Sequence, residues 1–588
     1  MARFSEMKKP KDSRGTLRRI ISYLGTYKIA LVIILILCLS SNVLALFGPK
    51  LAGQAINEAA VGAGLIDFGK IWYYVRLMAI FYVTSALVTI AINVIMVKVS
   101  KSAAGKMRKD VFDKLMTLPV GYFDSHQTGD IISRVSYDID VVGTCLVTDI
   151  TTILTSLVTI VGSFIMMIVI SPVMAIVVLV TIPLSLGYTF WMRKLVQPRY
   201  SKRSKAYGQM NGVTEEMLSG HKTIQAYAYE EVANARFNEA NNNAAEAFFS
   251  AEKLALSMGP VMNTINNLSL TIIAVLGSIL FMNGAATLGQ ISSFVLYSRK
   301  FSGPINEISN TINEIFSALA AAERVFALLN ETEEVADVEN AAVLENVQGH
   351  VEMDHVSFGY VPGKIILKDL SLDALPGRQI AIVGPTGAGK TTIINLLMRF
   401  YDVNGGKIFV DGAESRTYTR SSLRGAYAMV LQDTWVFRGT IFENIAYGKE
   451  DATMEEVVAA AKAAHIHPFI MRLPEGYNTI INEDGGNISK GQKQLLTIAR
   501  AMLYDAKILI LDEATSNVDT TTERQVQAAM KELMKGKTCF TIAHRLSTIQ
   551  NADCILVVNH GDVIEQGTHK ELMEQKGFYH KLYTAQFS

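Results

Sequence analysis

The chain has 588 residues, 50% of them hydrophobic, and its mean hydropathy of +0.25 is high for a soluble protein. This length predicts several domains, and a formal net charge of +1 argues against the basic surface of a nucleic-acid-binding protein. The four cysteines have neither C-x-x-C spacing nor metal-ligand spacing, which favours buried thiols over a disulfide framework.

The apolar residues are concentrated in the first half of the chain, in six stretches long enough to cross the roughly 30 Å hydrocarbon core of a membrane. The predicted spans are residues 29–47, 71–97, 146–170, 173–192, 256–282 and 291–316. The N-terminus is basic and no cleavage site follows the first apolar stretch, so we expect a retained membrane anchor. Buried helices of a soluble protein could mimic one or two such stretches, but not six.

The basic residues predict how the spans are oriented. Eight Lys and Arg residues precede the first span, and the long segments 98–144 and 192–255 carry seven and nine. The short links between the other spans contain only Lys50 and Lys70. The positive-inside rule therefore places both termini and the two long segments in the cytoplasm. Because these segments have helical character, we expect the membrane helices to extend well beyond the bilayer.

The predicted spans also contain polar side chains that lipid solvates poorly. They are Asn42, Arg76, Asn93, Asp149, Asn263, Asn266 and Asn267. Such residues either line an interior cavity or substrate path, or form hydrogen bonds between helices and lie near the interface. The sixth span becomes polar early, at Arg299, Lys300, Asn306, Glu307, Asn310, Asn313 and Glu314. A pore and a helix that leaves the membrane both explain this, so the sequence assigns no span residue to substrate.

A change in composition marks the boundary between two domains. Residues 321–349 are rich in Ala and Glu and are expected to form a solvated connector. They separate a membrane domain, residues 1–320, from a second domain, residues 350–588. The second domain alternates strand and helix patterns, which predicts an α/β fold with a largely parallel sheet.

An apolar strand pattern at residues 380–383 continues into a sequence of the form G-x-x-x-x-G-K-[ST]. Its small residues let backbone N–H groups surround phosphate oxygens at the N-terminus of the next helix. Lys390 is expected to reach the β- and γ-phosphates, and the Thr391 hydroxyl to bind Mg²⁺. The expected phosphate-binding residues are Gly384, Pro385, Thr386, Gly387, Ala388, Gly389, Lys390, Thr391 and Thr392. The predicted fold class is an α-helical transmembrane bundle followed by an α/β P-loop NTPase domain.

A second apolar strand pattern ends in two carboxylates, Asp512 and Glu513. In a P-loop ATPase, Asp512 would hold Mg²⁺ through water and Glu513 would polarise the attacking water. Two other side chains have alternative interpretations. Tyr360 either stacks on an adenine or only packs against its neighbours. His544, at the end of another apolar stretch, either contacts phosphate or is a structural histidine.

Together these residues resemble ATP-binding cassette (ABC) exporters that fuse six membrane spans to one nucleotide domain, and the resemblance covers essentially the whole chain. It implies that Gln432 is the Q-loop glutamine that senses Mg²⁺, and that His544 is the switch histidine on the γ-phosphate. It also implies that Tyr360 is the A-loop aromatic. Asp519 lies in a sequence similar to the D-loop, which crosses to a second nucleotide domain.

The resemblance extends to the cytoplasmic segments of the membrane half. Residues 118–124 with residues 128–130, and residues 216–220 with residues 224–227, resemble the two intracellular segments of such exporters. In the family, each of these segments bears a short coupling helix that docks on a nucleotide domain.

One motif departs from the family pattern. The signature, normally Leu-Ser-Gly-Gly-Gln, reads Ile488-Ser489-Lys490-Gly491-Gln492. In the family it opens a helix whose N-terminus holds the γ-phosphate of ATP bound to the opposite subunit. Lys490 adds a side chain and a charge where glycine permits close backbone approach. Since the hydrolytic residues are intact, the chain resembles one half of an asymmetric heterodimer. A homodimer that tolerates Lys490 is the alternative, because lysine near phosphate is not electrostatically unfavourable.

The resemblance implies export by alternating access, with ATP and Mg²⁺ as cofactors and a second half-transporter as partner. The expected substrate is a small hydrophobic or amphipathic drug, lipid or peptide, and the expected location is the bilayer of the cell inner (plasma) membrane. No nucleic acid is expected as a partner, since six spans exclude a soluble ATPase that acts on DNA or ribosomes. An ABC protein that gates or regulates a channel is a further alternative, although the complete hydrolytic set favours a pump.

Overall fold

The computed structural model describes residues 12–61, 66–431, 434–482, 486–512, 520–542 and 549–587. This part of the chain divides into two compact units. The first comprises residues 12–118 and 126–333, and the second comprises residues 119–125 and 334–587. Residues 119–125 therefore belong with the second unit, although helices of the first unit precede and follow them in the sequence.

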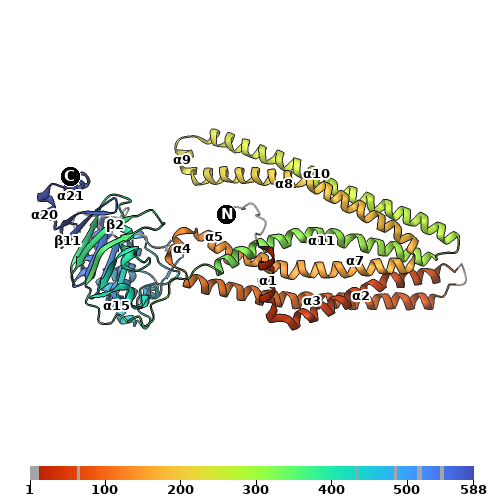
Figure 1. Ribbon diagram of the computed structural model, residues 1–588, viewed down its shortest axis with the longest axis horizontal. Helices are drawn as coiled ribbons and strands as arrows, with labels where there is room; N and C mark the ends of the chain where they lie inside the picture. Colours follow the sequence, from red (N-terminus) through yellow and green to blue (C-terminus); the bar gives the residue numbers. More distant parts are fainter. Residues whose placement is uncertain are drawn as a thin grey trace. The chain divides into compact units, whose positions relative to one another are not determined.

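The described residues of the first unit form helices and short connections. The helices are α1 (Ser13–Leu24), η1 (Gly25–Tyr27), α2 (Lys28–Ala59), α3 (Phe68–Thr117), α5 (Thr128–Ser133), η2 (Arg134–Asp138), α6 (Ile139–Thr144), η3 (Cys145–Asp149), α7 (Ile150–Ile170), α8 (Pro172–Ser219), α9 (His221–Ala226), α10 (Glu230–Met282) and α11 (Leu288–Leu329). Figure 1 shows α8 and α10 as a long pair with α9 at its tip. The α2–α3 and α7–α11 pairs also pack side by side.

Five helical stretches in the described residues are long and apolar enough to cross a membrane. They are Arg14–Ala59, Phe68–Thr117, Thr128–Ile170, Pro172–Ser219 and Glu230–Met282. At 1.5 Å per residue, a helix of 50 residues is about 75 Å long, more than twice the hydrocarbon thickness. The sixth predicted span lies on the continuous helix α11, which is not among these five. Its charged residues Arg299, Lys300, Glu307 and Glu314 fall within that span, so a sixth crossing stays a prediction.

The second unit is built on one sheet, in which ten strands are described, in the order β5-β4-β1-β2-β12-β11-β3-β10-β9-β6. The neighbours β11, β3, β10, β9 and β6 are parallel, and β1 pairs antiparallel with β2 and β4. The strands are β1 (Val351–Phe358), β2 (Leu367–Ala374), β3 (Gln379–Val383), β4 (Gly405–Val410), β5 (Ala413–Glu414), β6 (Tyr427–Val430), β9 (Ile508–Asp512), β10 (Thr538–Ile542), β11 (Cys554–Asn559) and β12 (Asp562–Gly567). The predicted parallel core is thus present, and it is extended by an antiparallel part.

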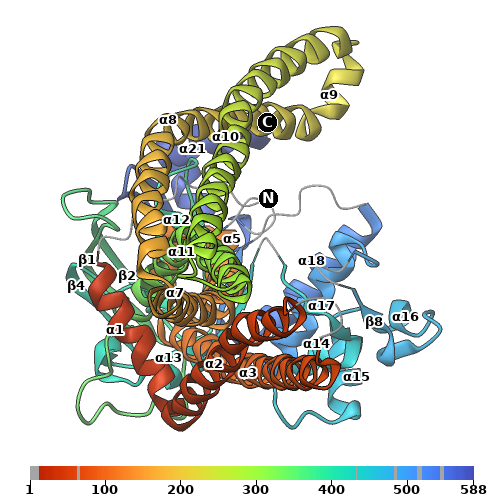
Figure 2. The same cartoon turned by 90° about the vertical axis from the view of Figure 1, so that its right-hand side faces the viewer.

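The remaining elements of the second unit are mainly helices. They are α4 (Val120–Ser125), α12 (Lys390–Leu397), η4 (Ser415–Thr417), α13 (Arg420–Gly425), α14 (Ile441–Ala446), α15 (Met454–Ala463), α16 (His467–Ile470), η5 (Gly476–Asn478), α17 (Lys490–Tyr504), α18 (Thr520–Met534), α20 (His569–Gln575) and α21 (Phe578–Phe587), with a small hairpin of β7 (Gly439–Thr440) and β8 (Ile480–Ile481). Figure 2 shows α14 to α18 grouped together, apart from β1 and β4.

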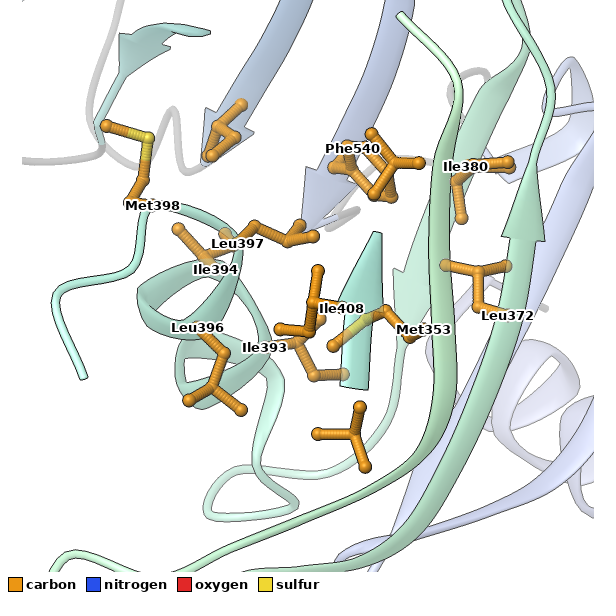
Figure 3. Close-up of a cluster of buried hydrophobic side chains, with 14 of the residues drawn as sticks. Met353, Leu372, Ile380, Ile393, Ile394, Leu396, Leu397, Met398, Ile408 and Phe540 are labelled. Atoms are coloured by element: carbon orange, nitrogen blue, oxygen red, sulfur yellow. The ribbon is translucent and has the colours of Figure 1, made fainter. Parts of the chain in front are cut away.

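Helix α12 is held in place by a hydrophobic core. Figure 3 shows Ile393 and Leu397 of this helix among apolar side chains of the sheet, including Ile380 and Phe540. All four side chains are buried, and burying a side chain of this size contributes about 1.5–3 kcal/mol. Only residues 384–389 separate β3 from the start of α12, so this core also fixes the loop that joins them.

The segment predicted as a solvated connector is not uniformly solvated. Residues 321–329 continue α11, and Ala322 and Val325 are buried there. Farther on, Glu334 forms an ion pair with Arg424, and an Asp337 carboxylate oxygen lies 3.1 Å from an Arg420 guanidinium nitrogen. Of the acidic residues that suggested a solvated connector, Glu334 is thus paired with an arginine 90 positions away, whereas Glu331, Glu339 and Glu345 are exposed as expected of a solvated segment.

Candidate functional site

The loop between β3 and α12 has the conformation that its glycines allow. Gly387 and Gly389 have φ angles of 81° and 108°, in the left-handed region that favours glycine. A Cβ atom at Gly384 would lie 2.1 Å from the carbonyl oxygen of Val558, so a side chain there would clash with the backbone. Gly389 is the N-cap of α12. The loop therefore directs backbone N–H groups around the N-terminus of this helix, an arrangement that binds anions.

Lys390 folds back over this loop. Its Nζ atom donates hydrogen bonds to the carbonyl oxygens of Gly384 at 2.8 Å and Pro385 at 3.0 Å. Burial lowers the pKa of Lys390, and the charge of Asp512 acts in the opposite direction. Thr391 is exposed beside it, whereas Thr392 is buried. The ammonium group is thus enclosed by the loop in which the sequence predicts phosphate binding.

The sheet register places Asp512 at the same end of the parallel strands as this loop. Asp512 of β9 pairs with Ile542 of β10, and Ile542 pairs with Ile382 of β3. Since neighbouring strands lie about 4.8 Å apart, the Asp512 backbone is about 10 Å from β3, near the start of the loop. The Thr391 hydroxyl and the Asp512 carboxylate are hard oxygen donors of the kind that Mg²⁺ prefers. These two residues, predicted as metal ligands, therefore fit a magnesium site in residue type, and Asp512 lies at the end of the sheet where the loop begins.

Tyr360 packs against α12 as well as against other aromatic rings. Its hydroxyl donates to Thr392 Oγ1 at 3.3 Å and accepts from Asn395 Nδ2 at 3.1 Å. Its ring is perpendicular to those of Phe358 and Tyr401, with centroids 5.0 and 4.9 Å away. The side chain remains 41% exposed. Tyr360 thus packs against its neighbours, which is one of the two interpretations of this residue. It is also partly exposed, which stacking on an adenine requires.

Tyr401 connects this aromatic group to α4. Its hydroxyl lies 2.5 Å from Asp124 Oδ2 and donates a hydrogen bond to it, and its ring lies against the Gly121 backbone. Burial, followed by the Asp124 carboxylate, raises the pKa of the Tyr401 hydroxyl. Tyr401 belongs to no motif, so the sequence did not identify it. Asp124 lies in the segment that resembles the first coupling region. For Tyr401, the one available signal was that an aromatic residue follows shortly after α12.

The signature residues form the start of α17. Ser489 is the N-cap, with a capping box in which Gln492 N donates to Ser489 Oγ and Ser489 N donates to Gln492 Oε1. Lys490 is the first helical residue and is exposed, and Gly491 is buried. The substitution of lysine for glycine therefore leaves the local helix start intact. Gln432, Glu513, Asp519 and His544 lie outside the described residues.

The fold and the loop define a class of protein: a membrane domain of long apolar helices fused to a P-loop nucleotide domain. Comparison with known proteins agrees. Residues 31–305 match the family model of the ABC transporter transmembrane region, and residues 367–516 match the family model described as ABC transporter. The chain belongs to the ABC transporter family and is a fused half-transporter of the exporter type.

Similar proteins cover nearly the whole chain. An uncharacterised ABC transporter ATP-binding protein of Bacillus subtilis, YfiC, is 44% identical over 98% of this chain and 95% of its own length. A fatty acid ABC transporter ATP-binding/permease protein of Mycobacterium bovis is 43% identical over 88% and 82%. The structure of a bacterial Atm1-family ABC exporter with ATP bound aligns with a TM-score of 0.75 at 28% identity, over 98% of this chain and 99% of that one.

These findings confirm the predicted family, fold class and enzyme class. The protein is a membrane-embedded, ATP-hydrolysing transporter, and half-transporters of this kind dimerise.

Proposed function

We propose that this chain exports a hydrophobic or amphipathic molecule by alternating access, driven by ATP hydrolysis between two nucleotide domains. The observation that carries the proposal is the loop between β3 and α12, whose carbonyl oxygens accept hydrogen bonds from the Lys390 ammonium. Asp512 lies at the same end of the parallel strands. Closure of two such domains over nucleotide would pull the coupling helices and reorient the membrane helices.

Each predicted site residue has a role in this proposal. The backbone N–H groups of residues 384–392 and the Lys390 ammonium bind the phosphates, and the exposed ring of Tyr360 stacks on the adenine. Thr391, Asp512 and Gln432 hold Mg²⁺, which would neutralise phosphate charge when bound. Glu513 accepts a proton from the attacking water, and His544 donates a hydrogen bond to the γ-phosphate. Ser489, Lys490, Gly491, Gln492 and Asp519 face a second subunit.

The proposed partner is a different half-transporter with a consensus signature. Support comes from Lys490, which is exposed at the first position of α17 while the capping box around it is intact. The helix start is therefore preserved, and only the surface offered to an opposing nucleotide differs from the family pattern. A homodimer is the alternative.

We place the dimer in the inner (plasma) membrane. Both termini lie in the cytoplasm, because basic residues cluster before the first span and in the segments 98–144 and 192–255.

Two exposed surfaces support coupling between the subunits. Helix α9 has no buried residue, and Tyr227 directly after it is 78% exposed. In the second unit, a cleft of about 360 Å³ is lined by Trp435, Tyr447 and Arg500, among others. The Arg500 guanidinium lies over the Tyr447 ring, 5.2 Å from its centroid. We assign this aromatic cleft to the coupling helix of a partner subunit.

A lipid-like substrate is supported by the similarity to the mycobacterial fatty acid transporter. A channel or channel regulator is the other candidate, and it would show no substrate transport against a gradient.

The test is to express the chain in membranes alone and with candidate partner half-transporters, and to measure ATP hydrolysis. Near-silence alone, with activity restored by a partner that carries Leu-Ser-Gly-Gly-Gln, is the expected result. Full hydrolysis by the chain alone, abolished by Glu513→Gln, would establish the homodimer instead. Glu513→Gln should also retain ATP binding, so rapid hydrolysis by that variant would overturn the role of Glu513.

A further inference from the structure

The first unit contains a cavity of about 320 Å³ between α8, α10 and α11. Its polar lining consists of hydroxyl side chains together with Asn263, Asn266 and Asn267 on α10 and Arg299 on α11. Ile182 of α8 and Phe301 of α11 supply apolar surface. Arg299 lies eight residues inside the predicted sixth span, about 12 Å along the helix axis. The cavity therefore combines charge, amide groups and apolar surface within the predicted spans.

The side chains of Arg299 and the three asparagines have no partner in the described part of the protein. No hydrogen bond or ion pair joins Arg299 or the three asparagine amides to another described residue. An arginine inside a membrane span is costly unless it faces a wet cavity or a partner of opposite charge. The guanidinium thus has five N–H donors available to a molecule that enters the cavity.

Other polar residues of the spans are satisfied within the protein. Asn42 Nδ2 donates to the Cys38 carbonyl oxygen at 2.8 Å, and its Oδ1 accepts from Thr159 at 3.0 Å. Lys300, next to Arg299, donates to the Ala45 carbonyl oxygen at 2.6 Å and lies over the Tyr82 ring. Polar span residues were explained either by hydrogen bonds between helices or by an interior cavity, and each explanation applies to different residues. Asn42 joins two helices, whereas the α10 asparagines face a cavity.

The charge of the cavity selects among amphipathic molecules. Arg299 is its one charged lining residue, and no Asp or Glu lines it among the residues that the structure describes. A cationic headgroup would meet like charge without compensation, whereas a carboxylate or phosphate would form charge-assisted, bidentate hydrogen bonds with the guanidinium.

We propose that this cavity binds the anionic headgroup of an amphipathic substrate. Arg299 pairs with the carboxylate or phosphate, Asn263 and Asn266 donate amide hydrogen bonds to it, and the hydrocarbon chain lies against Ile182 and Phe301. The proposal rests on the proposed export function and narrows its substrate to amphipathic anions.

The test compares headgroups on one hydrocarbon chain. The ATPase-competent dimer is placed in nanodiscs, and stimulation of ATP hydrolysis is titrated with oleate, oleoyl lysophosphatidate, oleyl alcohol and oleylamine. The expected result is half-maximal stimulation at a concentration at least about tenfold lower for an anion than for the alcohol or amine. The two anions distinguish a carboxylate substrate from a phosphate substrate. This comparison uses the unsubstituted chain, so it does not depend on the folding of a variant.

Arg299→Gln should then remove the preference for the anion, while Arg299→Lys, which keeps the charge, should retain part of it. The matched control is Arg76→Gln, because Arg76 is also an exposed arginine of a predicted span but does not line the cavity. Equal potency of oleate and oleylamine, or the same loss in Arg76→Gln, would overturn the proposal. If basal hydrolysis is normal in either case, the export function itself survives. Absence of hydrolysis with every partner would instead count against that function.

Discussion

Lys390 is the first residue of α12, directly after the loop that joins this helix to β3, and its surroundings explain why it suits a phosphate site. Burial lowers its pKa, which means that the protein solvates its charge less well than water does. The two carbonyl oxygens that accept its hydrogen bonds are neutral and belong to the loop itself. A phosphate oxygen would offer this ammonium a full opposite charge, so nucleotide binding compensates for its poor solvation.

Replacement of Lys390 by Ala should therefore weaken ATP binding directly. Hydrogen bonds to charged groups contribute about 1.5–3 kcal/mol, which corresponds to roughly a 10- to 100-fold higher Kd. Equilibrium binding of a fluorescent ATP analogue to the purified dimer measures this change. Lys407→Ala, on an exposed lysine of β4 paired with Glu414, is the matched control and should leave the Kd unchanged. Unaltered affinity in Lys390→Ala would remove Lys390 from the phosphate site.

At the scale of elements, the contact between α4 and the residues that follow α12 provides a physical connection to the site. Asp124 of α4 accepts a hydrogen bond from Tyr401, and the Tyr401 ring meets that of Tyr360. Tyr360 in turn donates to Thr392 in the helix that starts at the phosphate loop. A displacement of α4 would therefore disturb the position of the aromatic ring predicted to stack on adenine.

Tyr401→Phe should loosen α4 while keeping the aromatic ring. Loss of the hydroxyl removes a hydrogen bond of about 1 kcal/mol or more, so amide hydrogen exchange of residues 120–125 should accelerate about fivefold or more. Asp124→Ala removes the same bond from the other side, and the double variant should add little to either single change. Tyr418→Phe, whose hydroxyl bonds to Val410 in the same unit, should not alter exchange in α4. Additive effects at positions 124 and 401 would show that the two side chains act independently.

At the scale of the molecule, each of the two units has a hydrophobic core of its own. In the second unit, Cys539 lies in the central strand β10 and is buried with the strands on both sides of it. Burial raises the pKa of its thiol to about 12, and Lys537 opposes this shift weakly. Because thiolate is the reactive form, reactivity of Cys539 reports opening of this core.

Cys539 should resist maleimide labelling at pH 7–8 in the folded protein and become labelled when urea unfolds the second unit. The folded pKa lies above the ordinary value of 9.0. The burial of the neutral thiol therefore stabilises the fold fully below pH 9, and this contribution is lost as pH rises toward 12. ATP at 100 times its Kd should shift labelling to higher urea, because it adds about 2.7 kcal/mol to the stability of the unit that binds it. Mass spectrometry of the labelled peptide measures both effects, and rapid labelling without urea would contradict the buried position.

The features that depend on local chemistry follow from the order of the amino acids alone. Glycine spacing followed by lysine and threonine predicts a phosphate loop because backbone conformation and helix start are set within a few residues. Continuous apolar stretches predict membrane helices because lipid requires every backbone group to be bonded within its own segment. The family, the order of the two domains and their fold class follow from these local patterns.

Contacts between residues that are distant in the sequence depend on how the whole chain folds. Asp124 and Tyr401 are 277 positions apart, so no local pattern could pair them. The same holds for Glu334 and Asp337 of the connector, whose arginine partners lie 90 and 83 positions away. It holds also for the polar residues of the spans. Asn42 and Asn263 are the same residue type in similar apolar surroundings, and only helix packing gives one a bonding partner and the other an open cavity. Hydrogen-bond satisfaction depends on the neighbours in space, and the fold of the whole chain sets those neighbours.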